Sequence, residues 1–150
     1  MKAIDLFAGW GGFTTGAALA GVDVVWAANH WRIAVDVHAL NCPDTIHVCQ
    51  DLRQADWTQV PRYDLLLASP ACQGHSSASQ PVRREHHDAE RATAWAVVDC
   101  AEATRPRAFV VENVPAFRAW ALYPTWCQAL RVLGYHLTEQ LVDATACGVP

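Results

Sequence analysis

Long apolar runs, targeting segments and closely spaced cysteines are missing from this sequence. No uncharged apolar stretch approaches the ~18 residues that a membrane-spanning helix requires. The first residues, MKAIDLF, lack the apolar run and the cleavage site of a signal peptide. We therefore expect a soluble, cytoplasmic protein that has no membrane partner.

The six cysteines lie seven or more residues apart, so the sequence has no Cys-x-x-Cys pair of the kind that zinc sites use. They are also too sparse for the disulfide framework of a small secreted protein. We expect no metal site, and we expect most of the cysteines to be reduced residues of the core.

Positive charge is scarce as well. The net charge of −4 argues against a protein that holds nucleic acid mainly through its overall field, so such binding must be local or shared with a partner. The 150 residues, 52% of them hydrophobic, contain no repeat and no low-complexity linker. Residues 1–150 are therefore expected to form one domain around one core.

Short apolar runs rich in Val, Ile and Leu predict strands over residues 3–7, 22–28, 63–68 and 108–111, with shorter candidates at 45–49 and 136–143. Segments of helical period lie between them, at 13–20, 33–40, 91–103 and 116–133. This alternation predicts an α/β fold, a parallel sheet with helices on both faces. Residues 69–88 should form a long loop at the carboxyl end of a strand, where the ligand crevice of such sheets lies.

A glycine-rich turn, DLFAGWGGF over residues 5–13, follows the first predicted strand and opens the first helix. Such a turn lets a ligand approach the backbone closely. It differs from the dinucleotide fingerprint, which would need Gly at Thr14. A turn that only packs strand against helix remains the alternative.

Two reactive side chains follow neighbouring predicted strands. Cys72 lies in the polar segment SPACQGHS, and Glu112 comes directly after the strand at 108–111. A thiol at the mouth of a sheet can be exposed and activated, and both groups should face one crevice. Buried structural roles would be the simpler interpretation if either residue stood alone.

Three segments in this order, DLFAGWGG, PACQGHS and ENV, resemble the first, fourth and sixth motifs of the DNA cytosine-5 methyltransferases. The resemblance covers essentially the whole chain, with NHW at 29–31 and DL at 51–52 in the places of the second and third motifs. It implies a class I, Rossmann-like methyltransferase fold that binds S-adenosylmethionine and takes a cytosine flipped out of DNA.

By the same resemblance, Cys72 is the nucleophile that adds to C6 of cytosine, and Glu112 stabilises the charge that develops on the ring. The expected cofactor-binding residues are Phe7, Gly9, Gly11, Gly12, His30, Trp31, Asp51, Leu52 and Pro70. Candidate contacts to the nucleic acid are Gln73, Ser76, Arg83 and Arg84. The two arginines lie in a charge-balanced segment, for which a solvated loop that enters a helix is the favoured interpretation.

The sequence departs from the family pattern at three positions. His30 replaces a usual acidic residue that accepts hydrogen bonds from both ribose hydroxyls, whereas a neutral imidazole offers one acceptor. We therefore expect weaker cofactor binding. Ala71 replaces a proline beside the nucleophile, which predicts a looser loop, and His75 occupies the place of an aromatic residue, where we expect it to pack.

The family's arginine motif, seventh strand, target recognition domain and last helix are absent from the 150 residues. We expect a complementary polypeptide or a longer chain to supply them, and inactivity without it; a truncated relic or a fragment is the alternative. Methylation of cytosine in tRNA and a non-catalytic module that binds cofactor or a partner are the competing functions. The role expected here is DNA modification in a phage or bacterial restriction-modification system.

Overall fold

The computed structural model of the chain describes residues 1–71 and 92–148. In this part five parallel strands form one sheet in the order β3-β2-β1-β4-β5. The strands are Lys2–Leu6 (β1), Asp23–Asn29 (β2), Ile46–Cys49 (β3), Leu65–Ala68 (β4) and Ala108–Val111 (β5). The predicted parallel sheet and the first five of its strands are confirmed. Because the chain runs outward from β1 to β3 and then returns to place β4 on the other side of β1, the strand order switches between β1 and β4.

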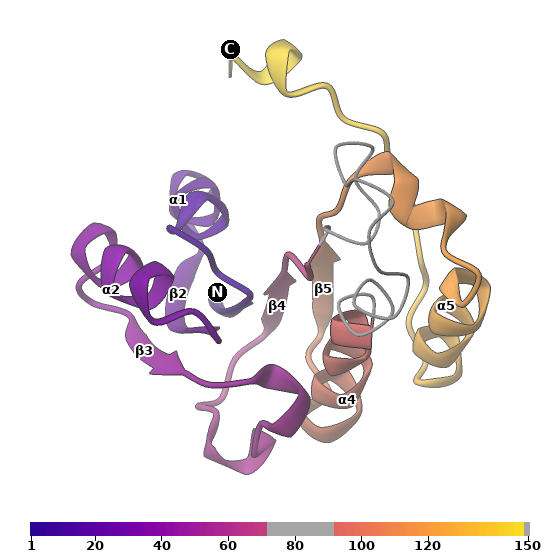
Figure 1. Cartoon of the computed structure of the whole chain (residues 1–150), viewed down its shortest axis with the longest axis horizontal. Helices are drawn as coiled ribbons and strands as arrows, with labels where there is room; N and C mark the ends of the chain where they lie inside the picture. The colour runs from indigo at the N-terminus through magenta and orange to yellow at the C-terminus, as the bar shows by residue number, and fades with distance from the viewer. Residues whose placement is uncertain (72–91, 149–150) are drawn as a thin grey trace, which may run out of the picture.

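Helices cover both faces of this sheet, as predicted (Figure 1). They are Gly12–Leu19 (α1), Arg32–Asn41 (α2), Trp95–Thr104 (α4) and Tyr123–Val132 (α5). Short 3-10 turns lie at Leu52–Gln54, Trp57–Gln59, Ala92–Ala94, Pro115–Ala119 and Ala144–Cys147. Side chains of β1 point alternately to the two faces of the sheet: Ala3 packs with Ala17 of α1 on one face, whereas Ile4 and Leu6 pack with α4 and α5 on the other.

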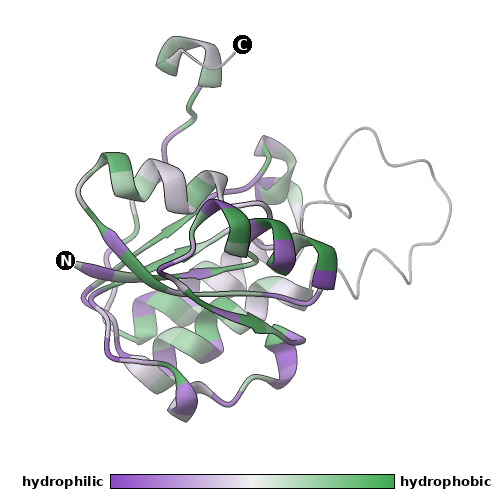
Figure 2. Ribbon diagram, turned by 90° about the vertical axis from the view of Figure 1, so that its left-hand side faces the viewer, coloured by the Kyte–Doolittle hydropathy of each residue, from purple (hydrophilic) through white to green (hydrophobic). Residues whose placement is uncertain are grey.

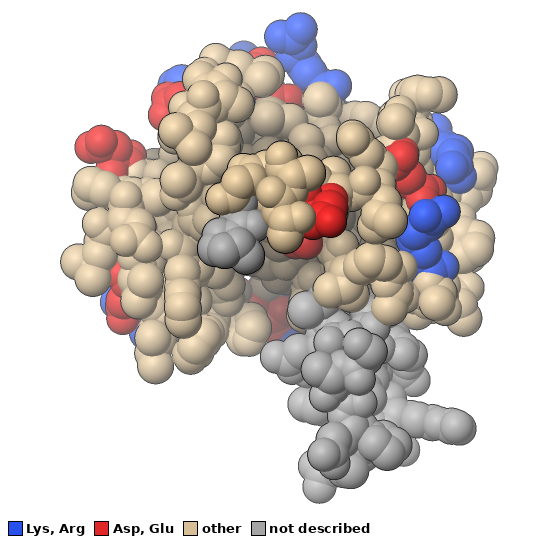
Figure 3. Space-filling model, turned by 90° about the horizontal axis from the view of Figure 1, so that it is seen from above, with Lys and Arg blue, Asp and Glu red and all other residues tan. Residues whose placement is uncertain are grey.

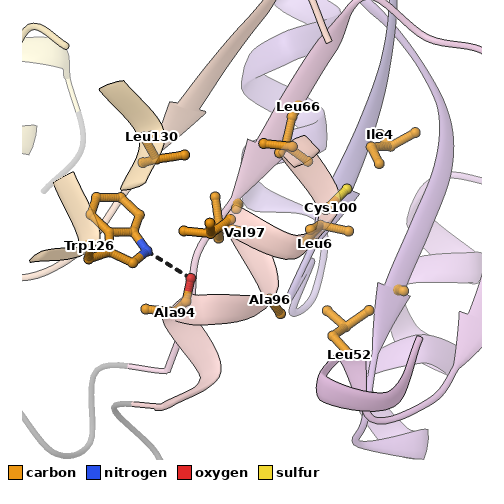
Figure 4. Packing of buried hydrophobic residues seen from close by; sticks show 14 of the residues in the cluster. Ile4, Leu6, Leu52, Leu66, Ala94, Ala96, Val97, Cys100, Trp126 and Leu130 are labelled. Carbon is orange, nitrogen blue, oxygen red and sulfur yellow. Dashed lines mark hydrogen bonds between the residues drawn. The ribbon is translucent and has the colours of Figure 1, made fainter. Parts of the chain in front are cut away.

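The larger part of the core lies between the sheet and α4 and α5 (Figure 4). Val97 of α4 and Leu130 of α5 are fully buried there, beside Leu66 of β4. The indole of Trp126 is also buried, and its Nε1 donates a hydrogen bond to the carbonyl of Ala94 at 2.9 Å. A buried N–H without a partner would be costly. This hydrogen bond therefore stabilises the packing of α5 against the start of α4.

The helix predicted over 116–133 is interrupted. A 3-10 turn occupies Pro115–Ala119, and α5 begins only at Tyr123, with Pro124 in its first turn. Proline lacks a backbone N–H and clashes with the preceding turn, so it suits the first turn of a helix and not its interior.

The sixth strand predicted at 136–143 is wrong. This segment has no regular structure, and Leu141 and Val142 are 77% and 60% exposed. Leu137 still packs against the core, and the chain then leaves the body of the molecule toward its C-terminal end (Figure 2). An extended segment becomes a strand only when a neighbouring strand accepts its backbone hydrogen bonds, and no described strand lies beside this one.

The cysteines are less buried than the sequence suggested. The five described ones are all free thiols, but only Cys100 and Cys127 are buried; Cys42 is half-buried, and Cys49 and Cys147 are exposed. No group of described His, Cys, Asp and Glu side chains could hold a metal ion. Among the described helices, none is long and apolar enough to cross a membrane.

Candidate active site at the carboxyl ends of the strands

The carboxyl ends of β1, β4 and β5 lie side by side. Leu6 pairs with Ala68, and Ala68 pairs with Val111. Backbone bonds continue this register beyond the strands: Ser69 N–H donates to Leu6 at 3.1 Å, and Glu112 N–H donates to Ala68 at 3.0 Å. The residues that directly follow these three strands therefore share one edge of the sheet.

The glycine turn after β1 has an unusual backbone. Phe7, Gly9 and Gly11 have φ values of +61°, +53° and +95°, in the region that side chains disfavour. A Cβ at Gly11 would lie 3.3 Å from the His38 ring and 3.4 Å from the Cys42 sulfur, whereas one at Gly12 would meet nothing within 4 Å. Gly11 is thus required by the fold, and Gly12 leaves open space at the start of α1.

A buried polar network that the sequence reasoning missed lies under this turn. Asp5, fully buried on β1, accepts a hydrogen bond from Thr14 Oγ1 at 2.8 Å. The same oxygen lies 3.1 Å from His38 Nε2, and His38 Nδ1 lies 2.7 Å from His47 Nε2. Burial raises the pKa of Asp5 to about 7. An acidic residue inside an apolar strand was the sequence signal for it.

The ends of β2 and β3 hold the residues expected around the adenosine part of a cofactor. His30 is exposed and Trp31 is 49% exposed, and the Trp31 N–H donates to Asn29 Oδ1 at 3.0 Å. Asp51 accepts bonds from the Arg53 backbone at 3.0 Å and from its guanidinium at 2.6 Å. The hydrogen bonds with Arg53 lower the pKa of Asp51.

Not every predicted cofactor residue presents its side chain in the same way. Leu52 is only 3% exposed and packs in the core beneath this edge, so what it can offer a ligand there is mainly its backbone. Pro70 is buried after β4, and its carbonyl accepts a hydrogen bond from Asn113 Nδ2 at 2.9 Å. Asn113 therefore links the segment that leads toward Cys72 to the end of β5, beside the exposed Glu112.

Five predicted site residues lie outside the described part of the chain: Cys72, Gln73, Ser76, Arg83 and Arg84. His75 lies outside it too. The structure thus brings together the glycine turn, Trp31, Asp51, Pro70 and Glu112 along one sheet edge, and the placement of Cys72, the predicted nucleophile, rests on the sequence.

The surface toward which β4 and β5 point is mostly uncharged (Figure 3). In that view the visible Lys and Arg side chains lie toward its rim. Two hollows, of about 660 and 300 Å³, are lined by other residues, among them Tyr63 and Asp64 for the first and Trp26 and Val48 for the second. The strand register and the hydrogen bonds of the described residues therefore define the candidate site.

The described residues fit S-adenosylmethionine in most respects. The glycine turn leaves its backbone free of side chains at Gly12, Trp31 offers an exposed aromatic face, and Asp51 offers a carboxylate. The one mismatch is His30, whose imidazole replaces a two-acceptor carboxylate. A parallel sheet in the order β3-β2-β1-β4-β5 that carries these features at the carboxyl ends of its strands has the architecture of a class I S-adenosylmethionine-dependent methyltransferase fold.

Within that class, the chain belongs to the C-5 cytosine-specific DNA methylase family, whose model matches residues 1–150. It is 35% identical to the type II methyltransferase M.HgiDI of Herpetosiphon aurantiacus and 30% identical to M.HindV of Haemophilus influenzae, over its full length in both cases. It covers 48% and 49% of these relatives, so the chain spans about half their length.

Solved structures agree with this assignment. A putative DNA modification methyltransferase encoded within a prophage of E. coli matches 89% of the chain with a TM-score of 0.72 and 26% identity, and the chain covers 38% of it. The Dnmt2 methyltransferase of S. pombe matches 88% of the chain with a TM-score of 0.66 at 20% identity, which shows the shared fold; 39% of that protein is covered. The predicted family and fold are confirmed, and S-adenosylmethionine is the methyl donor of this family.

Proposed function

We propose that this chain supplies the methyl-donor site and the nucleophile of an enzyme that methylates C5 of cytosine in DNA. The observation that carries the proposal is the backbone register that sets the glycine turn, Pro70 and Glu112 side by side at the strand ends. Cys72 follows Pro70 by two residues in the sequence, and two residues of chain span at most about 7 Å, so we propose that its thiol serves the same edge.

Cytosine C5 is a poor nucleophile, and the proposed roles of Cys72 and Glu112 address this. The Cys72 thiolate adds to C6 of the flipped base, which makes C5 electron-rich, while the Glu112 carboxyl group contacts N3 and the exocyclic amine. S-adenosylmethionine, when bound, supplies an electrophilic methyl group for C5. A base then removes the C5 proton, and the Cys72 thiolate leaves to restore the aromatic ring.

The donor would be held by the residues at the ends of β1, β2 and β3. Phe7 would lie against the adenine and Trp31 on its other side, while the turn at Gly9–Gly12 would accommodate the methionine part. Asp51 would meet the adenine edge, with its carboxylate already fixed by Arg53. In this arrangement His30 faces the ribose with fewer acceptors than a carboxylate would have.

A complementary polypeptide, or a continuation of this one, is part of the proposal, because the chain spans about half the length of its relatives. Among the described strands, β5 at the edge of the sheet pairs only with β4, and Val110 on it is 47% exposed. An open edge can accept another strand. Because this chain is acidic overall, we propose that the complement is basic, brings the target recognition region, and shares phosphate contacts with Gln73, Ser76, Arg83 and Arg84.

The test uses a DNA duplex in which the target cytosine is 5-fluorocytosine. Fluorine replaces the C5 proton that the base must remove before the thiolate can leave. The Cys72 adduct therefore persists and shifts the protein in a denaturing gel. We expect an adduct and methyl transfer once the chain is combined with its complement, and neither with Cys72→Ser, because a hydroxyl is a much weaker nucleophile. Methylation by that variant would refute the assignment of Cys72.

Two further arms separate the competing functions. An adduct formed with tRNA containing 5-fluorocytosine, and not with DNA, would identify the substrate as RNA. Binding of the demethylated cofactor without an adduct in any combination would identify a non-catalytic module. Robust activity of the 150 residues alone would refute the need for a complement.

A further inference from the structure

Four polar side chains form an unbroken line from a buried carboxylate to the half-buried edge strand β3. We call Asp5, Thr14, His38 and His47 the relay; they come from β1, α1, α2 and β3. The three successive contacts measure 2.8, 3.1 and 2.7 Å. Asp5, Thr14 and His38 are buried, so water does not satisfy these groups from outside.

When both rings are neutral and any Asp5 proton lies on Oδ2, the oxygen that faces Thr14, two arrangements of protons satisfy every contact of the relay. When Asp5 is ionised, Thr14 donates to it, His38 Nε2–H donates to Thr14, and His47 Nε2–H donates to His38 Nδ1. When Asp5 is protonated and donates to Thr14, every bond reverses, and His38 carries its proton on Nδ1. A proton taken up at His47 Nδ1 links the two states, because each contact then passes one proton toward Asp5 and no net charge is left on the rings.

The relay touches the glycine turn at two points. Gly11, the residue before α1, has no side chain, and the Asp5 carboxylate accepts a hydrogen bond from the Thr14 hydroxyl in the first turn of the helix. A negative charge at this end of a helix is favourable. The His38 ring packs against Gly11, where a Cβ would lie 3.3 Å away.

We propose that the relay residues are positioning residues of the methyl-donor site: the ionised relay holds the start of α1 and the glycine turn in the donor-binding form, and proton uptake, which keeps the contacts but removes the charge at the start of α1, weakens that hold. The part of this inference that concerns the donor rests on the proposed function. The proton movement itself does not.

The surroundings of Asp5 place this exchange near neutral pH. Its Oδ1 is buried without a hydrogen-bond partner, so the ionised form is poorly stabilised, and burial raises its pKa to about 7. The ionisable groups that face it are His38 on α2, His47 on β3 and Cys42, which follows α2. Burial lowers the pKa of both histidines and raises that of Cys42, so these neighbours are predominantly neutral at pH 7.

Carbon and nitrogen NMR of the purified chain tests the proton movement without any ligand. We expect the Asp5 carboxyl signal and the His38 ring signals to change with one midpoint, and His38 to move from the Nε2–H tautomer to the Nδ1–H tautomer as the pH falls. In Thr14→Val the two changes should separate, whereas Thr14→Ser should keep them together. A His38 tautomer that stays constant while Asp5 titrates would overturn the relay; because this is measured on the unmodified protein, the result does not depend on whether the variant folds.

Calorimetry with S-adenosylhomocysteine tests the link to the donor site. Affinity should fall about fivefold when the pH drops through the Asp5 midpoint, the size expected for loss of a negative charge at a helix N-terminus, and Thr14→Val should flatten that dependence. If the ligand fails to bind at any pH, the proposed function fails while the NMR result stands. If it binds equally at all pH values in the unmodified protein, the positioning role is refuted.

Discussion

Gly11 and Gly12 are neighbours in the sequence but should respond oppositely to the same substitution. Gly11→Ala forces an L-residue to a φ of +95° and places a methyl group 3.3 Å from the buried His38 ring. Left-handed backbone costs a non-glycine residue about 1–2 kcal/mol, and the close contact adds to this. We expect Gly11→Ala to lower the free energy of unfolding by about 2–3 kcal/mol.

Gly12→Ala is the matched control. Gly12 is not at positive φ, its added Cβ would meet nothing within 4 Å, and it lies at the first residue of α1. Replacing a helical glycine by alanine stabilises by up to about 1 kcal/mol, so we expect no loss of stability. The new methyl group would, however, occupy the space proposed for the donor, so binding of S-adenosylhomocysteine should weaken.

Two measurements on each variant decide the matter: the free energy of unfolding from a denaturant titration, and the Kd for S-adenosylhomocysteine at a temperature where both variants are folded. The expected pattern is a stability loss confined to position 11 and, at position 12, a binding loss in a fully stable protein. Equal stability of the two variants would show that the turn does not have the described backbone. Unchanged binding in Gly12→Ala would place the donor elsewhere.

Three further changes have definite expected outcomes. His30→Glu should tighten S-adenosylhomocysteine binding about tenfold, since a charged hydrogen bond contributes about 1.5–3 kcal/mol, and weaker binding in calorimetry would give the imidazole a positive role. Trp126→Phe should cost about 1–3 kcal/mol in denaturant unfolding, because the buried Ala94 carbonyl loses its donor; an unchanged midpoint would contradict this. Because burial raises the pKa of Asp5 from 3.8 to about 7, the folded state binds this proton more tightly than the unfolded chain, and stability conferred at low pH is lost as the pH rises through that window. Between pH 4 and 7 the unmodified protein should lose about 4 kcal/mol of its free energy of unfolding through this group, and Asp5→Asn should not show that loss. The free energies of unfolding of both proteins, measured across this pH range, check this; the same pH dependence in both would refute it.

The sheet was predictable because its strands are short apolar runs in the sequence. Residues 65–68, for example, are four consecutive apolar side chains, all buried, as a central parallel strand requires. The segment at 136–143, HLTEQLVD, mixes apolar and polar residues, and whether such a segment becomes a strand depends on a neighbour that its own sequence does not contain. The break before α5 was readable in principle, because Pro124 marks a first turn.

The site was predictable to the extent that it follows the strand ends. Strand order alone is enough to place the glycine turn, Pro70 and Glu112 together, because parallel strands end at one edge of the sheet. The relay could not, because Asp5 and His47 are separated by two helices and a strand, and which face of α2 His38 presents depends on packing. The side-chain burial of Leu52 has the same origin: its segment folds back onto the core.

Phe7 holds a left-handed backbone at φ +61° with a half-buried aromatic ring. A library screened only for thermal resistance should therefore enrich glycine or asparagine at this position, since either relieves backbone strain of about 1–3 kcal/mol. A library screened for methylation in cells should retain the aromatic ring. Divergence of the two selections at a single position would separate what the turn needs to fold from what it needs to work.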